Sequence, residues 1–323
     1  MEVYTTKDMT VSKYVHDDGS ETSIKTIGSC NNVLNPLTGK TEELEDRNKY
    51  VVFVSSSVGC KVGCKFCYLT AKSYPYAKLT IDEIVGNLKE AIISKMIESP
   101  ELKKKYVKIS FMGMGDALFN LDKTYMVAWE ILAWIHKKGF AAGVDGIDIG
   151  TVLPSKTKPQ FFRDVLSYLE TLVGVYERNP QSNSSSGVRL FYSLHSFNSI
   201  VREYLIPGTR DQEILFSIKY LRELFEENPE DLIFHQMFLD GINDTEMQIE
   251  TFVKTYRNTL NDHELRILKF NPCKNSIFRP SNEQREKEIL TLLNEHVNNI
   301  KVQHSAGSEI KASCGQFIMK TFK

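Results

Sequence analysis

Residues 50–70 read YVVFVSSSVGCKVGCKFCYLT, a short apolar run followed by a cysteine-rich segment. The run YVVFV is rich in β-branched and aromatic residues, which is typical of a buried strand. The segment after it holds three cysteines, Cys60, Cys64 and Cys67, with the spacing C-x3-C-x2-C. A helical pattern then covers residues 80–98. This order predicts a strand, a cysteine-bearing loop and a helix.

Strand-like and helix-like segments alternate along the rest of the chain. Apolar runs predict further strands over residues 106–114, 145–152, 188–195, 231–239, 264–272 and 299–305. Periodic patterns predict helices over residues 80–98, 121–138, 157–173, 211–227, 245–259 and 281–296. Such alternation is typical of βαβ crossovers in a parallel sheet. About six crossover units favour a partial (β/α)6 barrel, with a doubly wound sheet as the alternative.

The first 48 residues do not fit this repeat. KYVHDDGSETSIKTIG (13–28) alternates around a DDGS turn, which predicts a β-hairpin ahead of the barrel. We therefore expect a hairpin extension over residues 1–48 and a barrel with its C-terminal segment over residues 49–323. In such a barrel the functional residues gather at the carboxyl ends of the strands.

The composition excludes several classes of protein. The chain has 323 residues, 40 Lys and Arg against 41 Asp and Glu, and a formal net charge of -1. A charge this close to neutral means that any contact with nucleic acid must come from local patches. No stretch approaches the ~18 apolar residues of a membrane span, and the N-terminus lacks a secretory pattern. We expect a cytosolic protein in a reducing compartment, with no membrane contact, and a monomer.

The three clustered cysteines favour a metal cofactor over disulfides. Three thiolates from one loop can bind three irons of a [4Fe–4S] cluster and leave the fourth iron open to a substrate. Gly59 and Gly63 would let the loop fold tightly. A zinc site or a plain electron-transfer cluster are the alternatives, but zinc ligands usually come as two pairs. Cys273 and Cys314 are isolated and would have to arrive from distant segments.

With Phe66 before the third cysteine, the motif resembles that of the radical S-adenosylmethionine superfamily. The resemblance implies a partial (β/α)6 barrel whose open iron binds the amino and carboxylate groups of S-adenosylmethionine. It also implies an electron donor, such as flavodoxin or ferredoxin, for the one-electron reduction that cleaves this cofactor.

Further segments resemble one branch of that superfamily, the RlmN and Cfr adenine methyl synthases, over roughly residues 10 to 320. They are SSSVGC (55–60), GMGDALFN (113–120), YSLHSFN (192–198), REYLIPGTR (202–210), LDGINDT (239–245), KFNP (269–272) and SEIKASCGQF (308–317).

The resemblance implies roles for particular residues. Those that would bind S-adenosylmethionine are Gly115, Asp116, Thr151, Ser193, Leu194, His195 and Asn271. The first two would contact its amino group, Thr151 its ribose, and the others its methionine or ribose end. Cys314 matches the cysteine that takes a methyl group before this group is transferred to carbon 2 or carbon 8 of an adenine. The substrate would be ribosomal or transfer RNA.

The chain departs from the family pattern at three places. Phe53 stands where the family has a second cysteine, seven residues before the first cluster cysteine, that resolves a covalent enzyme–RNA adduct; Cys273 is the candidate to replace it. Ser23 stands where the family has a hairpin glutamate, so either this group is lost or Glu21 replaces it. The chain begins almost at the hairpin, without the family's N-terminal helical domain.

These departures keep two alternatives open. The first is a diverged enzyme that uses the same cofactors on another RNA, a nucleotide or a peptide. The second is a non-catalytic iron–sulfur or RNA-binding relative, which the joint presence of the cluster cysteines, Asp116, His195, Asn271 and Cys314 disfavours. Lys103, Lys104, Lys105 and Lys108 form the densest basic cluster, and we interpret it as a solvated face.

Overall fold

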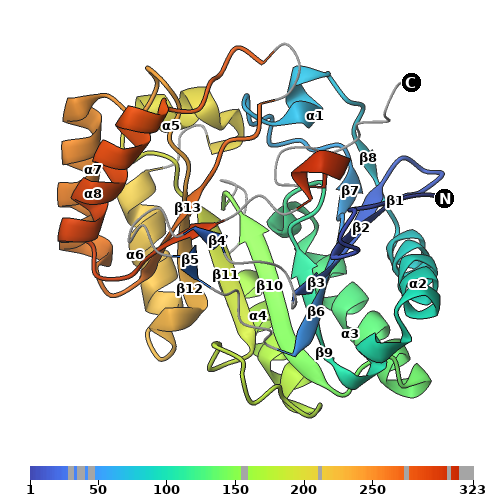
Figure 1. The fold of residues 1–323 in the computed structure, drawn as a ribbon. Coiled ribbons are helices and arrows are strands. Elements are labelled where there is room, and N and C mark those ends of the chain that lie inside the picture. Colours follow the sequence, from blue (N-terminus) through green and yellow to red (C-terminus); the bar gives the residue numbers. More distant parts are fainter. Residues whose placement is uncertain are drawn as a thin grey trace.

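Parallel strands form one curved sheet at the centre of the molecule (Figure 1). The computed structural model describes residues 1–27, 33–34, 41–42, 48–153, 159–209, 213–272, 276–303 and 307–312. Within them the strands follow the order β1-β2-β3-β6-β9-β10-β11-β12-β13-β14. The parallel strands are β6 (Lys49–Phe53), β9 (Tyr106–Phe111), β10 (Val144–Thr151), β11 (Val188–Ser193), β12 (Leu232–Gln236), β13 (Glu264–Leu268) and β14 (Ile300–Gln303).

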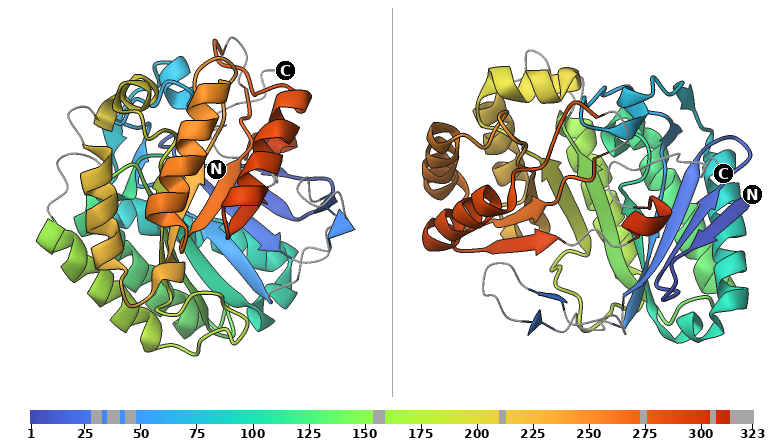
Figure 2. Two further views of the ribbon diagram at one scale, coloured as in Figure 1. Left: turned by 90° about the vertical axis from the view of Figure 1, so that its left-hand side faces the viewer. Right: turned by 45° about the horizontal axis from the view of Figure 1, so that its top comes forward.

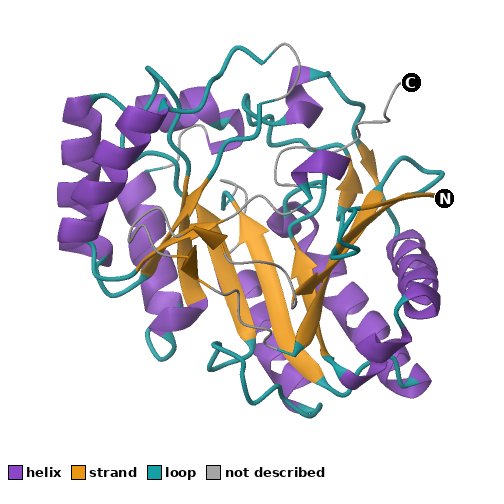
Figure 3. Ribbon diagram, viewed as in Figure 1, coloured by secondary structure: helices purple, strands orange, loops and turns teal. Residues whose placement is uncertain are grey.

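Each crossover between neighbouring parallel strands contains at least one helix. The long helices are α2 (Ile81–Glu98), α3 (Leu121–Lys138), α4 (Pro159–Gly174), α6 (Ile214–Leu224), α7 (Glu246–Leu260) and α8 (Glu283–His296). They lie along the outer side of the curved sheet (Figure 3). An open sheet with its helices on one side is the predicted partial barrel, whereas a doubly wound sheet would carry helices on both faces. No helix in the described part of the chain is long and apolar enough to cross a membrane.

Local signals fix the ends of the first two long helices. Thr80 caps α2 through a capping box, in which its hydroxyl accepts from Glu83 N at 3.2 Å and the Glu83 carboxylate accepts from Thr80 N at 2.7 Å. Gly139 ends α3 in a left-handed conformation with φ 62°. Both helices therefore begin and end close to the predicted positions.

The predicted N-terminal hairpin is present and belongs to the same sheet. β2 (Val11–Val15) pairs antiparallel with β3 (Glu21–Ile27), and β3 pairs antiparallel with β6. A third strand that the sequence pattern did not predict, β1 (Glu2–Thr5), pairs with β2 and forms one edge of the sheet. The division of the chain near residue 48 stays a prediction.

The two faces of the parallel sheet differ in chemistry. Toward the helices, the strands present apolar side chains with at most 1% exposure, including Val52, Ile109, Ile149 and Leu190. Since side chains alternate along a strand, their neighbours point to the inner face of the barrel. These inner residues include Lys49, Lys108, Asp148, Arg189, His235, Glu264 and Arg266. The barrel interior is therefore ionic, where barrels of this class usually carry branched apolar residues.

The inner charges are paired. Arg189 donates to both oxygens of Asp148 at 2.9 Å, and Lys108 lies 2.7 Å from Asp145. Lys49 also donates to Asp145, at 3.0 Å. Thus Lys108 is buried and ion-paired, and it does not share a solvated face with Lys103 and the neighbouring lysines.

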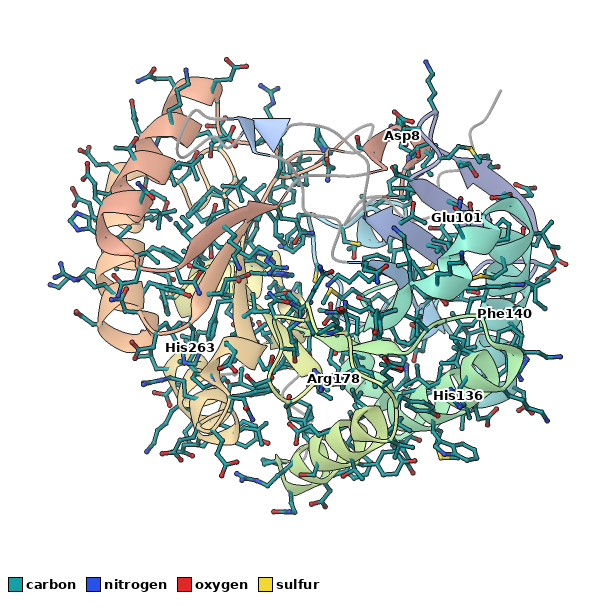
Figure 4. All side chains as sticks on the ribbon, turned by 60° about the horizontal axis from the view of Figure 1, so that its bottom comes forward. Asp8, Glu101, His136, Phe140, Arg178 and His263 are labelled. Atoms are coloured by element: carbon teal, nitrogen blue, oxygen red, sulfur yellow. The ribbon has the colours of Figure 1, made fainter. Side chains whose placement is uncertain are left out.

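Short elements lie around both ends of the barrel. They are β4 (Val33–Leu34), β5 (Thr41–Glu42), β7 (Ser57–Val58), β8 (Ala77–Lys78), α1 (Tyr68–Ala71), α5 (Ser199–Leu205), and the 3₁₀ helices η1 (Pro100–Lys104), η2 (Ala117–Asn120), η3 (Pro207–Thr209), η4 (Pro229–Asp231) and η5 (Ser308–Ile310). Of these, α1 and α5 lie at the end where the parallel strands terminate, and we call this end the mouth (Figure 1). Figure 4 is turned to bring the opposite end forward, where Phe140 follows α3.

The chain after β14 returns to the far edge of the sheet. β14 forms one edge, yet η5 lies beside β1 and β2 at the other (Figure 2). Gly307 packs against Val11, and Lys13 Nζ donates to the Lys311 carbonyl at 3.3 Å. Residues 307–312 therefore lie beside the hairpin edge of the sheet, opposite the edge formed by β14.

Candidate functional site

The cysteine loop leaves the carboxyl end of β6 and ends at α1. Gly59 has φ 64°, and a Cβ there would lie 2.4 Å from the Pro75 carbonyl, so the turn needs glycine. Two backbone hydrogen bonds join the loop to the segment around α5, Lys65 N to Leu205 O and Gly208 N to Val62 O, each of 2.9 Å. The loop is thereby held at the mouth between β6 and the end of β11.

The segment after β9 packs directly against the approach to this loop. Ser56 N donates to the Met114 carbonyl at 2.9 Å. A Cβ on Gly115, whose φ is 90°, would lie 2.4 Å from Ser57 Oγ and 2.5 Å from Ser56 Oγ. The glycine therefore allows the two segments to meet, and it brings Asp116 to the site.

The Asp116 carboxylate joins the ends of β9 and β10. It accepts from Val152 N at 2.8 Å, from Leu118 N at 2.9 Å and from the Thr151 hydroxyl at 3.0 Å. Burial raises the pKa of Asp116 to about 6, and these hydrogen bonds oppose the rise. The structure thus places Asp116 and Thr151 in direct contact, and the carboxylate anchors two strand ends.

The end of β11 carries the next predicted group, Ser193, Leu194 and His195. Leu194 is fully buried, and its N–H donates to the His235 carbonyl at 2.9 Å. His195 has φ 56°, a left-handed conformation that is uncommon for a residue other than glycine. Its carbonyl accepts from Asn243 Nδ2 at 2.8 Å, which holds the turn.

The His195 side chain points toward the cysteine loop. Its ring meets the edge of Phe66 with the ring centroids 5.1 Å apart. Burial, together with the nearby Arg202, lowers the pKa of His195 to about 3, so the ring is neutral. His195 Nδ1 is buried and has no hydrogen-bond partner within the described protein. A buried nitrogen of this kind is suited to a polar ligand.

Arg202 is a buried residue that the sequence reasoning did not single out. It is 1% exposed, and its guanidinium donates to the carbonyls of Ser193, Leu194 and Val152 and to the Tyr192 hydroxyl. It therefore ties the ends of β10 and β11 together. The only sequence signal is its place in the segment REYLIPGTR.

The three cysteines affect each other's charge. Burial raises the pKa of Cys64 well above its usual value, and Cys67 and Cys60 raise it further, whereas Arg202 lowers it. Burial raises the pKa of Cys60 to about 11, partly offset by backbone N–H groups of Val62, Gly63 and Gly115. No disulfide joins these described cysteines. The three half-buried thiols thus lie close enough to influence one another, and backbone N–H groups surround Cys60.

This donor set fits a [4Fe–4S] cluster. No three His, Cys, Asp or Glu side chains in the described ranges form a group that could hold one metal ion. In an iron–sulfur cluster each thiolate binds a different iron, so the sulfurs need not converge on one point. Bound iron would also favour the thiolate forms that burial alone disfavours.

Asn271 lies further out at the mouth, three residues after β13. It is half-buried, and its Nδ2 donates to the Lys269 carbonyl at 3.4 Å. The preceding Phe270 belongs to a second apolar cluster with Val62 and Val152, against which Cys60 and Cys64 pack. This cluster links the predicted residues of β10 and β13 to the cysteine loop.

The predicted methyl carrier, Cys314, lies outside the described residues, as do Cys273 and Cys30. The described chain before it reaches Ala312, whose N–H donates to Gly307 O at 2.8 Å. The Lys13 ammonium that holds Lys311 O also contacts the Glu21 carboxylate at 3.2 Å, and both side chains are buried. Lys13 therefore connects Glu21, in the N-terminal hairpin, to the segment that precedes Cys314.

Phe53 and Ser23, the two departures from the family pattern, are direct neighbours. They pair in register between β3 and β6. The Phe53 ring lies 4.9 Å from Lys25 Nζ, which keeps a cation over this aromatic face. A phenylalanine there has no exchangeable proton and no sulfur.

The comparisons with known proteins point to one family. The chain is 31% identical over 269 residues to the dual-specificity RNA methyltransferase RlmN of Campylobacter jejuni, covering 83% of this chain and 67% of that protein. It is 28% identical over 287 residues to the protein of the same name from Campylobacter hominis, covering 89% and 72%. The ribosomal RNA large subunit methyltransferase N of Nitrosopumilus maritimus is 26% identical over 95% of this chain and 79% of its own. No protein-family model matches.

Solved structures show the same fold. A radical SAM methyltransferase from Sphaerobacter thermophilus aligns with a TM-score of 0.69 at 22% identity, over 98% of this chain and 80% of its own. The [FeFe]-hydrogenase maturase HydG aligns with a TM-score of 0.50 at 11% identity, over 83% of this chain and 55% of its own. At these identities the likeness concerns the barrel alone.

Proposed function

Because this chain belongs to the RlmN family of radical S-adenosylmethionine enzymes, we propose that it transfers a methyl group to an adenine of ribosomal or transfer RNA. The observation that carries the proposal is the convergence of the cysteine loop, Asp116, Thr151 and His195 at the mouth of the barrel. Carbon 2 or carbon 8 of the adenine would receive the methyl group.

Cys60, Cys64 and Cys67 would hold the [4Fe–4S] cluster. With S-adenosylmethionine, this cluster would supply one-electron cleavage of the sulfonium and hence abstraction of a hydrogen atom. The chain's own share is to hold the cofactors and exclude water. The loop is fixed by hydrogen bonds with Leu205 and Gly208, and Cys60 and Cys64 pack against the apolar cluster that contains Val152 and Phe270.

The residues at the strand ends would bind the second cofactor. Gly115 offers backbone close to Cys60, where a side chain would collide with Ser56 and Ser57. The Asp116 carboxylate accepts hydrogen bonds from Thr151 and Val152, which hold this backbone in place. It also supplies a negative charge for an ammonium group. His195 Nδ1 offers a neutral buried group toward the ribose or methionine end.

Cys314 would carry the methyl group. Its thiolate takes the methyl from one S-adenosylmethionine, and the carbon is then passed to the adenine. Support comes from residues 307–312, which lie beside β1 and β2 and are held at Lys311, three residues before Cys314. The Lys13–Glu21 pair would fix this approach and keep a carboxylate beside it.

The experiment uses anaerobically reconstituted protein and S-adenosylmethionine labelled at its methyl group. Mass spectrometry of the peptide that contains Cys314 is expected to show one added methyl, and Cys314→Ser should abolish it. Cys30→Ser is the matched control and should leave it unchanged. Release of deoxyadenosine without a methyl on Cys314 would mean that the cofactors serve another reaction.

The same preparation tests how the adduct with RNA is resolved. Phe53 cannot take the role of the family's second cysteine, so we propose that Cys273 replaces it. Cys273→Ala should then accumulate a covalent protein–RNA species that denaturing gels detect. Normal turnover of this variant would reject the role, while leaving the methyl transfer itself in place.

A further inference from the structure

The rim of the cysteine loop combines lysines with aromatic rings. Three lysines each lie over a tyrosine ring: Lys65 at 3.8 Å from Tyr204, Lys61 at 4.6 Å from Tyr76 and Lys72 at 5.9 Å from Tyr68. We call these six residues the loop rim. All three lysines are exposed, Tyr204 is 40% exposed and Tyr76 is half-buried.

The rim is locally basic in a chain that is neutral overall. Between residues 48 and 81 there is no aspartate or glutamate, while the segment contains the exposed lysines Lys61, Lys65, Lys72 and Lys78. The whole chain has a net charge of -1. Positive charge is therefore concentrated on the one loop that carries the cluster cysteines, which is the local patch that a nearly neutral nucleic-acid-binding protein needs.

The rim also lies next to the cluster cysteines. Lys61 follows Cys60 directly, and Lys65 follows Cys64. Tyr76 Cα lies 3.3 Å from where a Cβ on Gly59 would be, which places Tyr76 beside the residue that precedes the first cysteine. Tyr204 belongs to α5, which the hydrogen bond from Lys65 N to Leu205 O joins to the loop. A ligand on the rim would thus be led into the mouth.

Lysine ammonium groups over tyrosine rings suit the binding of a single-stranded polyanion. In the structure the ammonium groups lie over the rings, and because all three lysine side chains are exposed they can turn away to phosphates. A ring released in this way offers a face on which a base can stack, as in proteins that bind single strands without reading sequence. Ile200 and Ile277, each 79% exposed, extend the apolar surface; Ile200 lies one turn from Tyr204, whose ring meets Phe278, the neighbour of Ile277.

We propose that the loop rim binds the RNA strand that flanks the target adenine, with the three lysines on phosphates and Tyr204 and Tyr76 as stacking faces. This inference rests on the proposed function and adds the surface that presents the substrate. An acidic electron-transfer protein would be attracted by the same charges but has no need of the exposed rings.

The test compares two variants with equal changes of charge. The rim variant is K61Q/K65Q/K72Q, and the control is K103Q/K104Q/K138Q at the opposite end of the barrel. The control matches the geometry, because Lys103 lies 5.5 Å over the ring of Phe140, a residue labelled in Figure 4. Fluorescence anisotropy with a labelled single-stranded transcript is measured over a range of salt concentrations.

The rim variant should bind the transcript at least about tenfold more weakly. The slope of log affinity against log salt concentration should become shallower by about 2, since three phosphate contacts at ~0.7 each are removed. The control variant and a K61R/K65R/K72R variant should bind as the unaltered protein does. Tyr204→Ala should weaken binding by about fivefold or more with the salt slope unchanged, because it removes stacking alone.

The outcomes separate this inference from the proposed function. If the unaltered protein binds no RNA, the RNA substrate is wrong. If it binds RNA but the rim variant keeps its affinity and slope, the rim is not the RNA surface. Loss of reduction by an acidic electron donor, with RNA binding unchanged, would assign the rim to that protein and overturn the inference.

Discussion

The Thr151 hydroxyl donates to both oxygens of the Asp116 carboxylate, at 3.0 and 3.1 Å. This contact joins the end of β10 to the loop after β9 across 35 positions of the chain. Val152 N and Leu118 N also donate to the carboxylate, so most of its acceptor sites already serve the fold. The group can still supply the negative charge that an ammonium group requires.

Asp116→Asn separates these two roles, because the amide keeps the shape and one acceptor oxygen. If the charge binds the amino group of S-adenosylmethionine, we expect the affinity for this cofactor to fall by about tenfold or more, the value of a hydrogen bond to a charged group. Equilibrium dialysis measures the affinity. Thr151→Val is the control for the anchor and should lower the melting temperature more than the affinity. Unchanged binding by Asp116→Asn would restrict the carboxylate to a positioning role.

Gly115→Ala tests the close approach of the two site segments. The new Cβ would lie 2.4 Å from Ser57 Oγ at a φ of 90°. Gly139 is a matched control, since its φ is 62° but nothing lies within 4 Å of its Cβ position. Gly139→Ala should cost about 1 kcal/mol of unfolding free energy, the strain of the backbone alone. Urea denaturation should show a clearly larger loss for Gly115→Ala, with reduced iron uptake, and equal losses would contradict the steric argument.

Arg202 provides a prediction about the cluster itself. Its buried positive charge lies close enough to Cys64 to lower the pKa of that thiol, so it should also favour the reduced, more negative form of a bound cluster. Arg202→Met should make the midpoint potential more negative and lower the unfolding free energy by about 3 kcal/mol or more, because carbonyls lose their donors. Arg202→Lys keeps the charge and should restore the potential more than the stability. If the midpoint potential is the same in the unaltered protein and both variants, Arg202 has only a structural role.

The ionic interior predicts a dependence of stability on pH. The Arg189 guanidinium holds the pKa of Asp148 well below its usual value of 3.8, despite the opposing effect of burial. A lowered pKa stabilises the folded state above pH 3.8, and this stabilisation is lost as the pH falls further. The unfolding free energy of Asp148→Asn should therefore depend less on pH in acid. At neutral pH it should be lower by about 3–5 kcal/mol, because Arg189 and Lys108 lose a partner.

The exposed Asp164 on α4 serves as the control for this measurement. Asp164→Asn should leave both the neutral stability and the acid limb within about 0.5 kcal/mol of the unaltered protein. Denaturation by urea at several pH values gives the two curves. If the unfolding free energy of Asp148→Asn falls as steeply in acid as that of the unaltered protein, other groups such as Asp145 or Glu264 control the pH dependence.

The sequence predicted the order of elements because their signals are local. The capping box at Thr80 and the terminal Gly139 bound two helices within a few residues. The carboxyl ends of strands were extended too far, as at residues 188–195, where β11 stops at Ser193. The apolar residues beyond several strands, such as Leu239 and Phe270, are buried in the second apolar cluster and not in the sheet. Periodicity alone cannot distinguish these two kinds of burial.

The candidate site was predicted where a motif lies on one loop and missed where partners are distant. The cysteine spacing and Asp116 were readable from adjacent residues. Arg202 was not, because its acceptors are backbone carbonyls up to 50 positions away. The ionic interior had a sequence signal, since Lys108, Asp148, Arg189 and Arg266 recur on one side of otherwise apolar strands. These charged residues point to the same face of the sheet, but this can be recognised only once the register of the strands is known.

The contact between Lys13 and the Lys311 carbonyl joins residues 298 positions apart. A ribosome must therefore add nearly the whole described chain after the N-terminal hairpin before this contact can form. Until then β1 and β2 lack the segment that covers them, and the cysteine loop faces an open barrel. The cysteine loop is thus synthesised long before residues 307–312 can dock on β1 and β2, so a cluster could be inserted while that side of the barrel is still open.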